Sequence, residues 1–79
     1  MVSVEVKGII KEIIFQGDKS CIFLIDNNDG QIIGTITKDS MRMLGKIQIG
    51  IEYEFLGYIT TYINHKKHIS NQFYVVEIN

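Results

Sequence analysis

The chain has 79 residues, a formal net charge of −1, one cysteine and no proline, and 46% of its residues are hydrophobic. This fraction excludes an intrinsically disordered chain, and the balanced charge excludes a protein that holds nucleic acid by overall basicity alone. Because Cys21 can form no internal disulfide and no apolar run approaches the ~18 residues of a membrane span, we expect one cytoplasmic domain over residues 1–79.

The first predicted element is one long strand with a bend. Val2, Val4 and Val6 alternate with polar residues, whereas the apolar residues from 9 to 15 fall on both faces. Gly8 stands where the pattern changes, and a glycine inside a strand is typical of a bulge or a sharp bend. A bent strand with two buried faces is what the first strand of a small closed barrel requires.

Two further strands follow, separated by turns. Residues 16–20 are polar or glycine and predict a turn, after which residues 21–25 predict a largely buried second strand. Residues 26–30, Asp-Asn-Asn-Asp-Gly, predict a tight hairpin because these residue types tolerate positive φ. Residues 31–36 are then the third strand.

A short helix is expected after the third strand. Asp39 or Ser40 is placed to cap it, residues 41–44 form its body, and Gly45 is expected to end it. Its apolar residues are expected to close one end of the barrel.

The last two strands flank a basic turn. Alternation resumes at Ile51, with Phe55 on the inward face and Tyr58 and Tyr62 on the outward one. Residues 64–68 predict a polar turn, and residues 73–78 the last strand. Five strands with a helix between the third and the fourth predict an all-β, five-stranded OB-type barrel. The main competitor, an SH3-like barrel, has its helical turn between the last two strands.

Several short motifs carry a family resemblance. They are Gly8-Ile9-Ile10, Ile13-Ile14-Phe15, Ile33-Gly34, the strand at residues 50–57, and Gln72-Phe73 after a basic turn. With them the chain resembles the N-terminal OB-like β-barrel domain of RecD/TraA-type ATP-dependent DNA helicases (exodeoxyribonuclease V alpha-like). The resemblance implies an accessory role in handling single-stranded DNA during bacterial DNA repair and recombination, beside other domains of a helicase-type protein.

The helicase motor itself is not expected in this chain. No Gly-x-x-x-x-Gly-Lys-Ser/Thr motif for phosphate binding occurs in the sequence. The chain is therefore expected to be an excised N-terminal domain or a free-standing relative, with no enzymatic activity of its own.

Lysines on two predicted loops are candidates for contacting nucleic acid. Lys66 and Lys67 lie in the turn between the last two strands, and Lys19 lies in the turn between the first two. These loops flank the ligand groove of an OB barrel, so the three ammonium groups are candidates to grip a phosphate backbone. The alternative is a solvated hairpin tip with no ligand.

Tyr58 and Tyr62 are the candidate stacking residues. Four positions apart on a strand, they lie on one face about 13 Å from each other. Exposed aromatic rings on an OB surface stack on unpaired bases. The alternatives are cross-strand packing with Phe73 or Tyr74, and a docking surface for a partner domain.

No other residues predict chemistry. His65 and His68 lack the cysteine or carboxylate partners of a metal site, and Cys21 opens an apolar strand as a core residue would. We therefore expect no catalytic residue, metal, cofactor or small-molecule substrate. Two functions stay open: an accessory domain that handles single-stranded DNA, and a protein-interaction or structural module without nucleic-acid contact.

Overall fold

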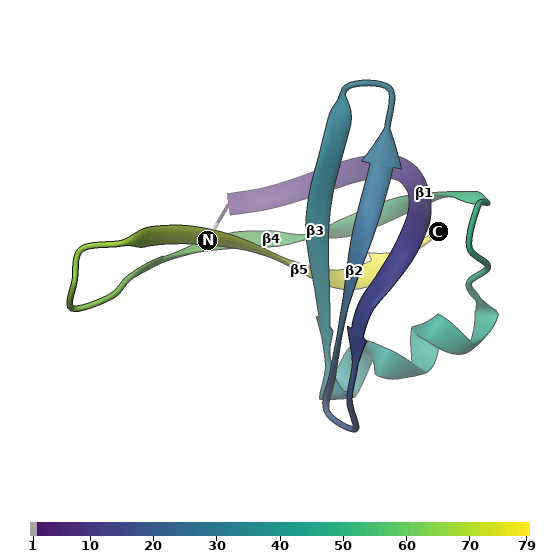
Figure 1. Cartoon of the computed structure of the whole chain (residues 1–79). Helices are drawn as coiled ribbons and strands as arrows, with labels where there is room; N and C mark the ends of the chain where they lie inside the picture. The colour runs from purple at the N-terminus through teal and green to yellow at the C-terminus, as the bar shows by residue number, and fades with distance from the viewer. Residues whose placement is uncertain (1) are drawn as a thin grey trace.

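The structure, a computed structural model, describes residues 2–79 as a closed barrel of five strands. The elements are β1 (Val2–Gln16), β2 (Ser20–Asn27), β3 (Gly30–Thr37), the 3₁₀ helix η1 (Lys38–Lys46), β4 (Glu52–Ile63) and β5 (Ile69–Ile78). The strand order is β1-β2-β3-β5-β4, and β1 closes the barrel by pairing with β4. The five-stranded OB-type barrel with a short helix between the third and fourth strands is confirmed (Figure 1).

The bend in β1 allows one strand to pair on two sides. Its residues from Val2 to Ile9 pair with β4, and those from Ile9 to Gln16 pair with β2. A Cβ added at Gly8 would lie 2.6 Å from the carbonyl oxygen of Asp26, so only glycine lets β1 approach β2 so closely here. The predicted long, bent first strand is confirmed, and Figure 1 shows its curve.

The core gathers inward-facing side chains from all five strands. Phe23 and Phe55 lie near its centre, with ring centroids 6.0 Å apart. In β2 the buried positions alternate with half-buried ones, so this strand is less fully buried than we expected. Cys21 is buried as predicted, and burial raises the pKa of its thiol above the ordinary 9.0. The buried residues are Ile10, Cys21, Phe23, Ile25, Ile36, Phe55, Phe73 and Val75.

Helix η1 covers the barrel, but its predicted boundaries were wrong. Thr37, in an extended conformation, precedes the helix and makes no side-chain capping hydrogen bond, so neither Asp39 nor Ser40 is the cap. The helix also continues through Gly45 to Lys46. Its apolar side chains and that of the next residue pack against the core, as expected: Met41, Met43, Leu44 and Ile47. Within residues 2–79 no helix has the length and apolar character that a membrane crossing requires.

Strands β4 and β5 continue beyond the barrel as a two-stranded projection, which we call the arm (residues 60–72; Figure 1). Strand β5 pairs with β3 only at Phe73 and Tyr74, whereas its pairing with β4 reaches out to Ile69. The prediction that β5 begins at residue 73 was therefore wrong. Polar residues 70–72 do not alternate with apolar ones, and pairing with β4 is what makes them a strand.

Candidate functional site

Three tyrosines lie together where the arm leaves the barrel. Tyr58 and Tyr74 are directly opposite each other on β4 and β5, and their rings stack with centroids 5.5 Å apart at an interplanar angle of 28°. The predicted packing of Tyr58 on Tyr74 is thus confirmed, whereas Phe73 is in the core. Tyr62 lies on the same face four residues further along β4, and its hydroxyl is 3.2 Å from that of Tyr74.

Hydrogen bonds order these phenols. The Tyr74 hydroxyl donates to Oε1 of Gln72 at 2.6 Å, so its oxygen is left to accept the proton of Tyr62. The bond with Tyr74 lowers the pKa of Tyr62 below the ordinary 10.0, because the Tyr74 hydroxyl can turn to stabilise a Tyr62 phenolate. The same bond raises the pKa of Tyr74. Tyr62 remains 49% exposed, and Tyr58 and Tyr74 are half-buried.

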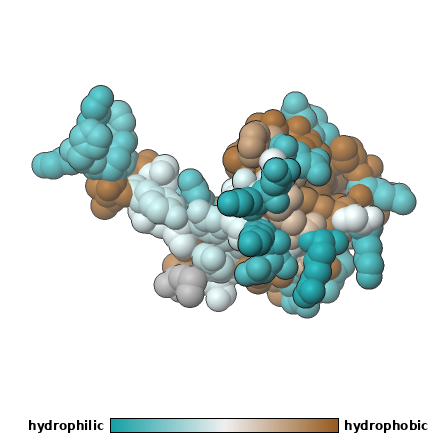
Figure 2. Space-filling model, turned by 90° about the horizontal axis from the view of Figure 1, so that it is seen from below, coloured by the Kyte–Doolittle hydropathy of each residue, from teal (hydrophilic) through white to brown (hydrophobic). Residues whose placement is uncertain are grey.

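The turn at the end of the arm presents the two predicted lysines. Oδ1 of Asn64 accepts hydrogen bonds from the backbone N–H groups of Lys66 (2.9 Å) and His68 (3.0 Å). Lys67 adopts the left-handed conformation at φ 61°, and its N–H donates to the Asn64 carbonyl. Lys66 and Lys67 are exposed, and the ion pair found within residues 2–79 joins other residues, Lys7 and Glu52. Figure 2 shows hydrophilic atoms at the end of the arm.

Lys19 lies elsewhere. It is exposed in the turn between β1 and β2, where the Gly17 N–H donates to the Ser20 carbonyl at 2.9 Å. In Figure 1 this turn is at the lower end of the barrel beside η1, whereas the turn of the arm projects to the far left. The structure therefore brings Tyr58 and Tyr62 together through Tyr74 at the base of the arm that carries Lys66 and Lys67, and it does not bring Lys19 to them.

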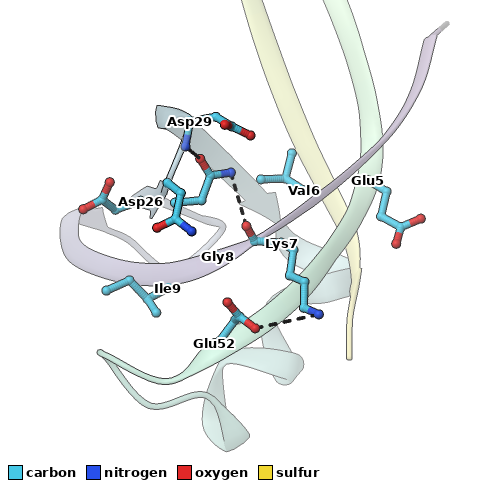
Figure 3. Close-up of a pocket in the computed structure, with 10 residues that line it drawn as sticks. Glu5, Val6, Lys7, Gly8, Ile9, Asp26, Asp29 and Glu52 are labelled. Atoms are coloured by element: carbon cyan, nitrogen blue, oxygen red, sulfur yellow. Dashed lines mark hydrogen bonds and ion pairs between the residues drawn. The ribbon is translucent and has the colours of Figure 1, made fainter.

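One hollow in the surface of the barrel is acidic. It has a volume of about 570 Å³ and lies beside the bend of β1, with carboxylates from Glu5, Asp26, Asp29 and Glu52 against the single ammonium group of Lys7. Figure 3 shows these carboxylates spread around the rim rather than converging on one point. Within residues 2–79 no group of three or more His, Cys, Asp or Glu side chains is arranged to hold a metal ion. The charge of this hollow disfavours phosphate groups.

Sequence comparison and structure comparison give different results. No family model and no curated protein sequence matches the chain. Among solved structures, a replication protein A heterotrimer bound to ssDNA contains a chain that superimposes with a TM-score of 0.73 at 12% identity. That match covers 99% of this chain and 56% of the other, so this chain spans little more than half the length of that neighbour.

A second solved structure matches over nearly its whole length. The mitochondrial single-stranded DNA binding protein Rim1 of S. cerevisiae superimposes with a TM-score of 0.68 at 12% identity. The match covers 99% of this chain and 90% of that one. At this identity the two matches show the OB-type fold, and the resemblance to RecD/TraA-type helicases stays a prediction.

Proposed function

We propose that this chain is an OB-type domain that binds single-stranded DNA along the arm. One observation carries the proposal: β4 and β5 place the Tyr58–Tyr74–Tyr62 group on one face where the arm leaves the barrel, and the turn places Lys66 and Lys67 at the end of the arm. Both structural neighbours are described as binding ssDNA or being bound to it, which supports the choice of ligand.

Tyrosine rings and lysine ammonium groups supply the two interactions that bind single-stranded DNA, which are stacking on bases and attraction to phosphates. Base–aromatic stacking contributes about 1–3 kcal/mol per base, and it is available at Tyr62, whose ring is the most exposed of the three. The lysine ammonium groups are free of carboxylate partners within residues 2–79, so they can pair with phosphates. The net charge of −1 makes this local concentration of charge necessary.

The path of the strand follows from the charges. The acidic hollow beside the bend of β1 repels phosphates, so the bound DNA strand is expected to follow the arm and avoid the hollow. Lys19 is apart from the arm, and we propose it as a contact only for a strand long enough to cross the barrel. The setting of this activity beside a RecD/TraA-type helicase motor is proposed from the sequence resemblance, and the cytoplasmic location from the single cysteine, which can form no internal disulfide.

The test is a titration of fluorescent oligo-dT at low salt. The logarithm of the parent's binding constant should fall linearly with the logarithm of the salt concentration. Replacing both lysines should reduce the magnitude of this slope by about 1.4, since each phosphate contact to a single strand contributes about 0.7. The replacements are Lys66→Gln and Lys67→Asn, because asparagine tolerates the left-handed conformation of residue 67 and alanine would add strain to the loss of charge. Tyr62→Ala should weaken binding about 5- to 150-fold.

The matched control removes two exposed lysines elsewhere. Lys11→Gln with Lys38→Gln makes the same change of charge away from the arm, and should leave the slope close to that of the parent. Equal losses in the two double variants would show that only net charge matters and would reject the arm as the site. A parent that shows no salt-sensitive binding at high protein concentration would reject the function.

A second candidate function is contact with another domain of a helicase-type protein. The observation that favours it is the cross-strand pair Ile63 and Ile69 near the end of the arm, each 67% exposed. Their register places them on the face opposite the tyrosines. An absence of oligonucleotide binding in the titration above would favour this second function over the first.

A further inference from the structure

A small cleft opens where β3 and β5 diverge. The two strands pair in parallel only at Gly34 with Phe73 and Thr35 with Tyr74. Beyond these pairs β5 turns out along the arm, and a cleft of about 260 Å³ is left between the strands. Three isoleucines and Phe73 are its apolar lining residues, and Gln31, Asn71 and Gln72 are its polar ones.

Both amides from β5 have their carbonyl oxygens occupied. Oδ1 of Asn71 accepts a hydrogen bond from the Thr61 hydroxyl at 2.8 Å, and Oε1 of Gln72 accepts one from the Tyr74 hydroxyl at 2.6 Å. Each amide is therefore oriented with its NH₂ group left to donate, and neither nitrogen has an acceptor within residues 2–79. The Asn71 amide thus offers a donor to a ligand beside the apolar lining, on the same face of β5 as Phe73.

The size and position of the cleft limit what can occupy it. About 260 Å³ is below the roughly 300–1,000 Å³ of pockets for drug-sized ligands, and suits a single ring system. Gln72 joins the cleft to the tyrosine group, because this residue lines the cleft while its side chain accepts the hydrogen bond of the Tyr74 hydroxyl. The cleft therefore lies next to the tyrosine group along β5.

We propose that the cleft is a subsite for one unstacked base and that it selects bases that present carbonyl oxygens. This inference rests on the proposed function and adds base preference to it. Thymine presents two carbonyl oxygens to such a donor, whereas adenine presents none and offers only ring nitrogens beside its own amino group. In this subsite Asn71 contacts the base and Thr61 is a positioning residue that fixes the Asn71 amide.

The experiment compares oligo-dT with oligo-dA of about 12 nucleotides, within the usual site size of an OB domain. The quantity measured is the ratio of the two affinities, because stacking within oligo-dA alters absolute binding for every variant alike. Thr61→Val frees the Asn71 amide to rotate and should reduce the dT-over-dA ratio about 2- to 12-fold, the range for one hydrogen bond. Asn71→Ala should reduce it similarly, mainly by weakening dT.

Two controls separate positioning from structure. Thr61→Ser keeps the hydroxyl and should keep the ratio. Thr60→Val removes a hydroxyl one residue away on the opposite face, beside Tyr62 rather than Asn71. Any effect through Tyr62 should act on both oligonucleotides alike, so the ratio should stay that of the parent. Thermal unfolding midpoints close to that of the parent check that each variant is folded.

The outcomes distinguish the two proposals. If the parent binds both oligonucleotides and its ratio is unchanged in Thr61→Val and Asn71→Ala, the base subsite is overturned while the proposed function stands. A change of equal size in Thr60→Val also overturns it, since the effect would then not depend on Asn71. A parent that binds neither oligonucleotide overturns both.

Discussion

Gly57 positions the tyrosine group because it has no side chain. A Cβ at this position would overlap the carbonyl oxygen of Tyr74 on the neighbouring strand. The pairing of β4 with β5 shifts register between Leu56 and Gly57, and Tyr58 follows directly. The close approach of the two backbones therefore sets where Tyr58 meets Tyr74.

Gly57→Ala is accordingly expected to lower the free energy of unfolding by about 3 kcal/mol, because backbone atoms must move to admit the methyl group. Urea denaturation followed by tyrosine fluorescence measures this change. Gly45→Ala is the control: nothing lies within 4 Å of its added Cβ, and it should raise stability by about 0.4–1 kcal/mol. Equal effects of the two substitutions would contradict the steric argument.

Tyr62 provides a prediction about pH. Its pKa lies below 10.0, so its phenolate forms at a lower pH than that of an ordinary tyrosine and repels phosphates. Oligo-dT affinity should therefore fall as pH rises through the pKa of Tyr62. Tyr62→Phe should remove this fall.

The hydrogen bond with Tyr74 is the cause to be tested. Tyr74→Phe deletes it and should raise the pKa of Tyr62, as measured by ultraviolet absorbance of the phenolate. The affinity curve should then move to higher pH with the absorbance curve. An affinity that is independent of pH while Tyr62 titrates would show that this ring does not face the DNA.

At the scale of the element, the arm depends on its own turn. Asn64 accepts two backbone hydrogen bonds through its side chain, and residues 61–70 are exposed throughout. Little packing therefore supports the arm beyond the ladder between β4 and β5. Its opening is expected to need much less free energy than global unfolding.

Asn64→Ala should consequently loosen the arm and leave the barrel intact. Amide hydrogen exchange should accelerate at residues 61–71 and stay unchanged at core positions such as Phe23 and Phe55. Asn64→Asp retains the acceptor and should exchange like the parent. Equal acceleration in arm and core would mean that the two parts unfold together.

The strands could be predicted where apolar and polar residues alternate or where turn residues separate them. They could not be predicted where a strand forms only because it pairs with its neighbour. Alternating valines, the Asp-Asn-Asn-Asp-Gly turn and Gly8 predicted β1 to β3 correctly. The start of β5 was missed because Ser70, Asn71 and Gln72 carry no apolar alternation. The form of η1 was missed because a 3₁₀ helix leaves no period long enough to recognise.

At the scale of the whole molecule, the fold class followed from element order, whereas the site depended on register. Tyr74 was expected only as a packing partner, and the pairing across the turn places it at the centre of the tyrosine group. A slip of one residue would have moved it to the other face, and sequence alone does not exclude that slip. Lys19 was grouped with Lys66 from the general OB plan, which does not specify how far an arm extends.

The sharing of β1 between two neighbours also has a consequence for biosynthesis. Val6 pairs with Phe55 and Val2 with Ile59, so the first half of β1 has its partner strand only after residues 52–59 have been made. Such nonlocal contacts slow folding, and an unpaired strand edge rich in valine favours aggregation meanwhile. In a growing chain the second half of β1 can pair with β2, and β2 with β3, at an early stage. The first valines of β1 stay unpaired until β4 has been synthesised.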